Sequence, residues 1–95
     1  MGWLDIFSSR ARARREAAIA AALETGLLQR CPVCREVTEP AGADAMLART
    51  ERLAHQWIAG DDNRARPFDG DADALLREIH AQRRRAPFDC LCDRL

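Results

Sequence analysis

The chain has 95 residues, which is enough for one domain spanning 1–95 and too few for two. Its 15 arginines, with no lysine, balance 15 acidic residues, and this zero net charge argues against a protein built mainly to grip nucleic acid. Leu, Ile, Val and Phe together number only 19, so we expect a thin core that needs a staple or a partner.

Residues 1–8 begin the chain with a small apolar cluster that contains Trp3 and Phe7. The acidic Asp5 and the short apolar run are unlike a secretory signal, and no stretch reaches the length of a membrane span. We therefore expect a cytoplasmic protein with reduced cysteines. The cluster either packs onto the helices, which we favour, or forms a loosely attached segment that docks on a partner. Membrane binding is the less favoured alternative.

The first helix is predicted from a cap at Ser8 or Ser9 to about Thr25, and Gly26 is a plausible stop. Ile19, Leu23 and Leu27 recur at helical spacing and indicate a narrow apolar stripe. Residues 27–40 have a different composition, with β-forming residues and two prolines. They are predicted to form a loop or short β-hairpin around the Cys31-Pro32-Val33-Cys34 motif.

The second helix is predicted from about Asp44 to Ala59, where the apolar periodicity is clearest in the chain. One face carries Met46, Leu47, Thr50, Leu53, Ala54, Trp57 and Ile58. Gly60 ends this helix, and 61–63 is predicted to be a solvated turn.

The third helix is predicted from about Ala72 to Arg85, with Asp69 or Asp71 as its cap and Pro87 as its stop. A short echo flanks this helix, because Pro-Phe-Asp occurs at 67–69 and again at 87–89. We expect both phenylalanines, Phe68 and Phe88, to fold onto the core at turns.

Four cysteines carry the strongest chemical signal: Cys31, Cys34, Cys90 and Cys92. A tetrahedral zinc ion takes four thiolates, and a C-x-x-C pair places two of them at adjacent corners. The gap of 55 residues between the pairs is far from that of a zinc ribbon. We predict one structural zinc ion in a knuckle that joins the loop after the first helix to the C-terminal tail. Structural zinc would stabilise a domain whose core is thin.

Alternatives to this zinc site remain open at the level of sequence. The C-P-V-C pair also resembles a redox dithiol, although the βαβ pattern that usually surrounds one is absent. An iron–sulfur centre or unligated thiols are further possibilities. His80 is a candidate to approach the metal or to donate a hydrogen bond to a thiolate, whereas His55 is predicted to lie on the outer face of its helix.

No catalytic residue is predicted, because the sequence contains no known enzyme motif and a shell of four cysteines leaves zinc no open position. We do not expect an enzyme. Two arginine clusters are candidate partner-binding residues, together with Trp3 and Phe7: Arg10, Arg12, Arg14, Arg15 and Arg83, Arg84, Arg85.

The sequence therefore predicts a small three-helix domain with a four-cysteine zinc knuckle. Its expected function is that of a zinc-binding scaffold or adaptor for a protein partner. The alternative is a nucleic-acid-binding zinc protein that uses both arginine clusters, and a thiol redox protein is the third hypothesis.

Overall fold

The computed structural model describes the backbone of residues 3–94 and the side chains of residues 9–92. Its elements follow in the order α1 (Trp3–Thr25), β1 (Gln29–Arg30), β2 (Val37–Thr38), the 3-10 helix η1 (Ala43–Met46), α2 (Leu47–Ala59), the 3-10 helix η2 (Asn63–Phe68), α3 (Ala72–Arg85) and α4 (Leu91–Arg94). This mostly helical fold with a short two-stranded hairpin confirms the predicted fold class.

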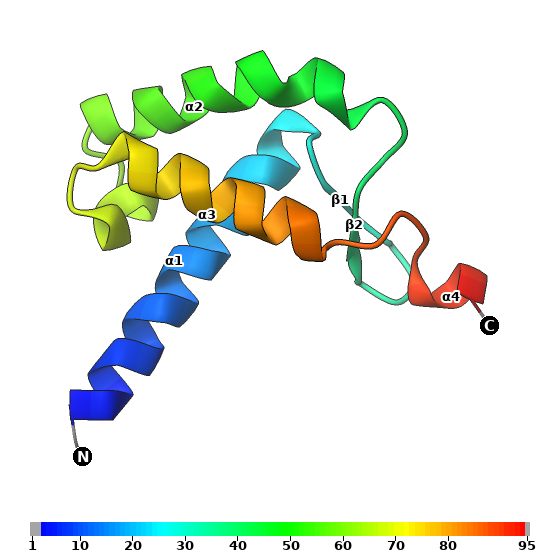
Figure 1. Ribbon diagram of the computed structural model, residues 1–95, viewed down its shortest axis with the longest axis horizontal. Helices are drawn as coiled ribbons and strands as arrows, with labels where there is room; N and C mark the ends of the chain where they lie inside the picture. Colours follow the sequence, from blue (N-terminus) through cyan, green and yellow to red (C-terminus); the bar gives the residue numbers. More distant parts are fainter. Residues whose placement is uncertain (1–2, 95) are drawn as a thin grey trace.

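The first helix is longer than predicted, because α1 already includes Trp3 and passes through Ser8 and Ser9 without a break. No glycine or proline interrupts residues 3–25, and arginine and alanine favour helix. The N-terminal half of α1 projects away from the rest of the fold (Figure 1). The side chains of Trp3 and Phe7 lie outside the described residues, so their predicted packing or docking stays a prediction.

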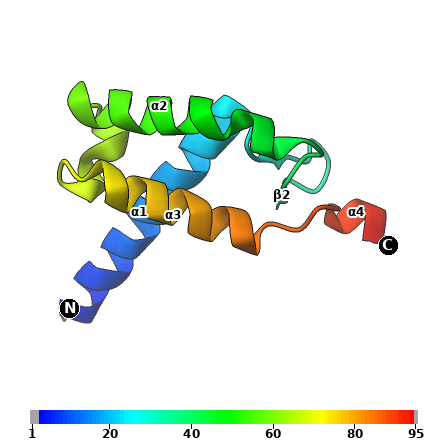
Figure 2. The same ribbon diagram turned by 45° about the horizontal axis from the view of Figure 1, so that its top comes forward.

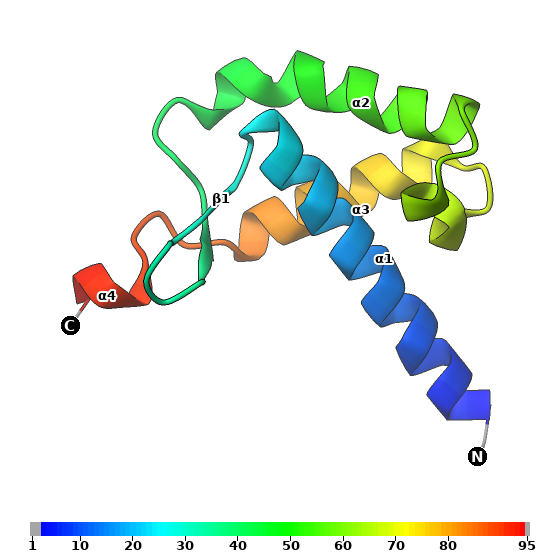
Figure 3. The ribbon, with the colours of Figure 1, turned by 180° about the vertical axis from the view of Figure 1, so that it is seen from behind.

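The buried face of α1 consists of alanines rather than of the larger residues that the sequence pattern favoured. Ala18, Ala21 and Ala22 have no exposed surface, whereas Ile19 and Leu23 are only partly buried. α1 packs against α2, α3 and η2, and it crosses in front of α3 in the view of Figure 3. Small side chains let the backbones approach closely, so alanine suits this crossing.

The second and third helices follow the prediction closely. α2 buries Thr50, Ala54 and Trp57, and α3 buries Leu75 and Ile79. The predicted cap of α3 is confirmed at Asp71, whose side chain accepts a hydrogen bond from the N–H of Ala74 at 3.0 Å.

A buried polar pair joins α1 to α2. The hydroxyl groups of Thr25 and Thr50 lie 2.8 Å apart, and both residues are almost fully buried. Each hydroxyl also lies within hydrogen-bonding distance of the backbone carbonyl four residues earlier in the chain. The pair is therefore satisfied without water.

The segment after α2 is a 3-10 helix, although its first residue, Asn63, was predicted to lie in a solvated turn. The side chain of Asp62 caps η2 by accepting the N–H of Arg64 at 2.9 Å. η2 turns Ala65 and Phe68 inward, and Phe68 is only 1% exposed. The prediction that Phe68 folds onto the core is thus confirmed.

The hairpin and α4 lie at one end of the molecule, while the first turns of α1 lie at the other (Figure 2). β1 and β2 pair antiparallel, with Gln29 opposite Thr38 and Arg30 opposite Val37. The predicted hairpin within residues 27–40 is therefore confirmed. Among the described residues, no helix is both long and apolar enough to cross a membrane.

Candidate metal centre

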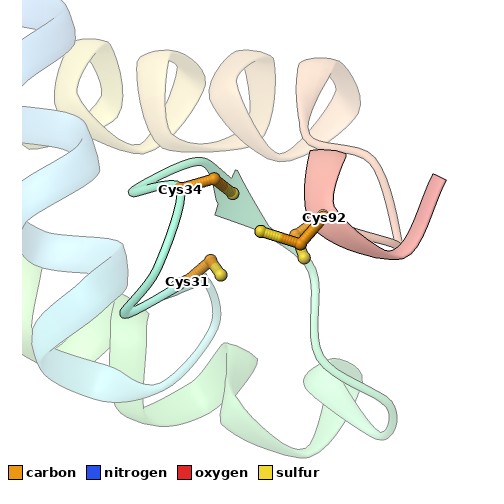
Figure 4. Close-up of side chains that lie close together, drawn as sticks. Cys31, Cys34 and Cys92 are labelled. Atoms are coloured by element: carbon orange, nitrogen blue, oxygen red, sulfur yellow. The ribbon is translucent and has the colours of Figure 1, made fainter. Parts of the chain in front are cut away.

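The turn between β1 and β2 positions the first two thiols. The N–H of Cys31 donates to the carbonyl of Glu36 at 2.9 Å, and the N–H of Arg35 donates back to the carbonyl of Cys31 at 2.9 Å. Arg35 takes a left-handed φ of 66°, which turns the chain sharply after Cys34. These bonds close a compact loop from which Cys31 and Cys34 extend toward the same space (Figure 4).

The tail segment, residues 86–94, brings the second pair to the same place. After α3 ends at Arg85, the carbonyl of Pro87 accepts the N–H of Glu39 at 2.9 Å. The N–H of Leu91 then donates to the carboxylate of Glu36 at 2.5 Å. The hairpin therefore holds the tail at two points, on either side of Cys90.

All four cysteine sulfurs form one group. The Sγ atoms of Cys31, Cys34, Cys90 and Cys92 lie within 4.8 Å of one another, and none of the four is in a disulfide. A tetrahedron with Zn–S bonds of 2.3 Å has sulfur–sulfur edges of about 3.8 Å. The four thiols therefore need only a small contraction to enclose a metal ion of this size. The expectation that the two distant pairs meet is confirmed.

The surroundings of the cluster favour ionisation of the Cys34 thiol and oppose ionisation of the Cys92 thiol. The pKa of Cys34 falls from 9.0 to about 6, mainly because a backbone hydrogen bond from Glu36 stabilises its thiolate, with Cys31 and Cys92 adding hydrogen bonds. The pKa of Cys92 rises to about 12, mainly because of its hydrogen bond with Cys34 and then because of burial. The negative charges of Cys31 and Cys34 raise the pKa of Cys92 further. A bound cation would offset these charges and allow all four thiols to ionise.

Neither histidine is part of this sulfur group. His55 is exposed on α2, as predicted. His80 is partly buried on α3, where it lines a surface hollow together with Glu39, Arg84 and Phe88. Its hydrogen bond to a thiolate stays a prediction.

The structure separates the two arginine clusters into residues that make contacts within the fold and residues that are exposed. Three of their members serve the fold: Arg10 pairs with Asp69, Arg14 donates to the carbonyl of Pro67 at 2.8 Å, and Arg83 bridges two acids. Arg83 contacts Glu39 at 2.6 Å and Asp44 at 2.5 Å, a role that its place near a helix C-terminus did not indicate. The remaining members, Arg12, Arg15, Arg84 and Arg85, are exposed.

The segments that carry the cysteines also expose apolar side chains. Val33 is 79% exposed, Phe88 75% and Leu91 49%, and these are the large exposed hydrophobic residues of the described part of the chain. The prediction that Phe88 folds onto the core is therefore wrong. The bond between Pro87 and Glu39 fixes the tail on the hairpin, and Phe88 follows it on the outside.

Comparison with known proteins adds no relationship to this geometry. No protein-family model, curated protein or solved structure matches the chain.

Proposed function

We propose that the four cysteines bind one zinc ion and that this ion holds the tail segment on the hairpin. The observation that carries the proposal is the convergence of four free thiols within 4.8 Å from segments 55 residues apart. Four thiolates in a tetrahedron suit zinc, which prefers this ligand set in structural sites. Iron can occupy a similar sulfur shell, so metal identity is the first quantity to measure.

The proposed zinc is structural rather than catalytic. Four protein ligands fill a tetrahedral shell and leave no position for water or substrate. The C-P-V-C pair lies in a hairpin turn and not at the start of a helix after a strand, where redox dithiols are usually found. We expect the zinc-loaded protein to have no insulin-reductase activity. Reductase activity in that form would favour the thiol redox hypothesis instead.

We propose further that the metal end, which consists of residues 31–36 and 86–92, binds a protein partner. Its exposed apolar residues, Val33 and Phe88, flank cysteines that zinc would fix in position. A rigid backbone lowers the ordering cost of binding, and aromatic side chains are enriched at the centres of protein interfaces. The chain would then act as a small scaffold that uses zinc to shape a contact surface.

A site-specific photo-crosslinker tests this surface in cells. Placed at Phe88, it should give a discrete cross-linked protein band, and the band should weaken when Val33 is changed to Ser. The matched control position is His55, which is exposed on α2 and belongs to neither the hairpin nor the tail segment. Equal cross-linking at both positions, or none at Phe88, would reject the proposed surface.

A further inference from the structure

Two adjoining hollows lie beside the metal centre, the larger between α1 and α3, and the smaller between α1, α3, the hairpin and the start of the tail segment. The larger, about 390 Å³, is lined by Arg12, Arg15, Glu78 and Arg85. The smaller, about 200 Å³, has Ile19 among its apolar lining residues. Arg85 lines both hollows, which places them side by side.

Helical spacing explains why these residues share a groove. Positions 12, 15 and 19 fall on one face of α1, and positions 78, 82 and 85 fall on one face of α3. Arg10 and Arg14 lie on the opposite face of α1, where they contact Asp69, Pro67 and Phe68. The fold thus separates structural arginines from a second set that faces the groove.

The arginines of the groove carry uncompensated charge. Among residues with described side chains, the guanidinium groups of Arg12, Arg15 and Arg85 find no ion-pair or hydrogen-bond partner. The larger hollow is lined by one carboxylate, Glu78, which accepts a hydrogen bond from Gln82 at 3.0 Å, and the smaller hollow by a second, Glu36, which accepts the N–H of Leu91. Three guanidinium groups against these two carboxylates leave one positive charge, which favours an anion such as a phosphate group. Guanidinium groups can also bind phosphate oxygens in bidentate fashion.

The smaller hollow adds an apolar wall beside this charge. Its lining consists of the apolar residues Ile19, Leu28, Val37, Ala86 and Pro87 together with Glu36, Gln82 and Arg85. A dry apolar cavity of about 150 Å³ is large enough to hold a benzene ring. A hollow of about 200 Å³ can therefore shelter one small apolar group next to the guanidinium groups.

We infer that the groove between α1 and α3 binds a small phosphomonoester that carries an apolar group. The phosphate contacts Arg12, Arg15 and Arg85, and the apolar group lies against Ile19 and Val37. Arg85 lies where the two parts of the ligand join. This site contains none of the four cysteines and neither Val33 nor Phe88, although its apolar part borders the hairpin and the tail segment.

Titration by NMR with inorganic phosphate and with phenyl phosphate tests the inference on the full chain. Because the arginines are exposed, we expect Kd values near the millimolar range. Phenyl phosphate should bind at least about tenfold more tightly than inorganic phosphate, since each buried CH₂-sized group contributes about 0.8 kcal/mol. Equal affinities for the two probes would overturn the apolar part of the site.

Matched arginine variants separate this site from general charge attraction. Arg85→Gln and Arg15→Gln should each weaken phenyl phosphate binding at least about fivefold, because each removes a charge-assisted hydrogen bond. Arg84→Gln removes the same charge from the neighbouring residue, which lines a different hollow, and should change affinity less than about twofold. Equal losses at Arg84 and Arg85 would overturn the site.

A single-stranded oligonucleotide is the third probe. Its binding should be weaker than that of phenyl phosphate and should depend steeply on salt. Tighter oligonucleotide binding that is lost in Arg85→Gln would assign the groove to a nucleic-acid backbone and overturn the inference for a small ligand.

Discussion

Removing the two tail cysteines should open the metal end while the helical core stays folded. In the variant with Cys90→Ser and Cys92→Ser, only Cys31 and Cys34 remain as thiol ligands, and they cannot complete a tetrahedron. No residue within 31–36 or 86–92 is fully buried, whereas Phe68, Leu75 and Ile79 lie in the core between the helices. The metal end therefore has little apolar burial of its own.

The expected magnitude follows from two opposing terms. Structural zinc contributes about 10–16 kcal/mol in small peptides. Ordering roughly a dozen residues of the two cysteine segments costs about 1–2 kcal/mol per residue, so the total ordering cost is similar in size to the zinc contribution. The two hydrogen bonds between hairpin and tail add only about 0.5–1.5 kcal/mol each. Most of the zinc free energy is thus consumed locally, and little is left to stabilise the helices.

Hydrogen exchange measured by mass spectrometry checks this expectation. Amide protection should be lost around residues 29–38 and 86–94 in the double variant, but retained in α2 and α3. Leu91→Ser is the matched control, because it changes an exposed residue between the two cysteines and keeps all four thiols. Loss of protection throughout α2 and α3 in the double variant, with the control intact, would refute this reasoning and make zinc the staple of the whole domain.

Three further predictions concern single side chains. Phe68→Ala should lower the free energy of unfolding by about 3–5 kcal/mol because the ring is buried, while Phe88→Ala should have little effect; urea denaturation measures both. Arg83→Gln should lower the free energy of unfolding by about 1–3 kcal/mol, because two carboxylates lose their partner. Arg84→Gln should change it by less than about 0.5 kcal/mol, and equal effects of the two substitutions would contradict the ion-pair assignment. In the metal-free protein Cys34 should be the first cysteine to be alkylated at neutral pH, and preferential alkylation of Cys92 would contradict this. The stability of the metal-free protein should also rise between about pH 6 and pH 9, because the folded-state pKa of Cys34 is depressed and the unfolded chain therefore binds more protons in that range.

The sequence was most informative where apolar periodicity and end signals agree. α2 carries apolar residues at helical spacing up to Gly60, and α3 begins after the capping Asp71. The start of α1 was harder to locate, because Ser8 and Ser9 resemble a cap but are also tolerated inside a helix. Its alanine face was missed because the pattern gives weight to large apolar residues, whereas a close helix crossing selects small ones.

Local contacts between distant segments explain the remaining differences. η2 is too short for a periodic signal, although Asp62 as a cap and the spacing of Ala65 and Phe68 could have indicated it. Arg83 resembles a residue placed for the helix dipole, but its partners come from far along the chain. Metal chemistry alone allowed the two cysteine pairs to be joined in advance, since a tetrahedral site demands four ligands.

Native mass spectrometry of the reduced protein, purified without chelator, tests the shared zinc site most directly. The wild-type chain should carry one zinc ion, and that ion should be released on acidification as the thiolates protonate. Two variants should each carry none: one with Cys31 and Cys34 changed to Ser, the other with Cys90 and Cys92 changed to Ser. A wild-type chain without metal, or a full zinc ion retained by either variant, would contradict a single site built from both pairs.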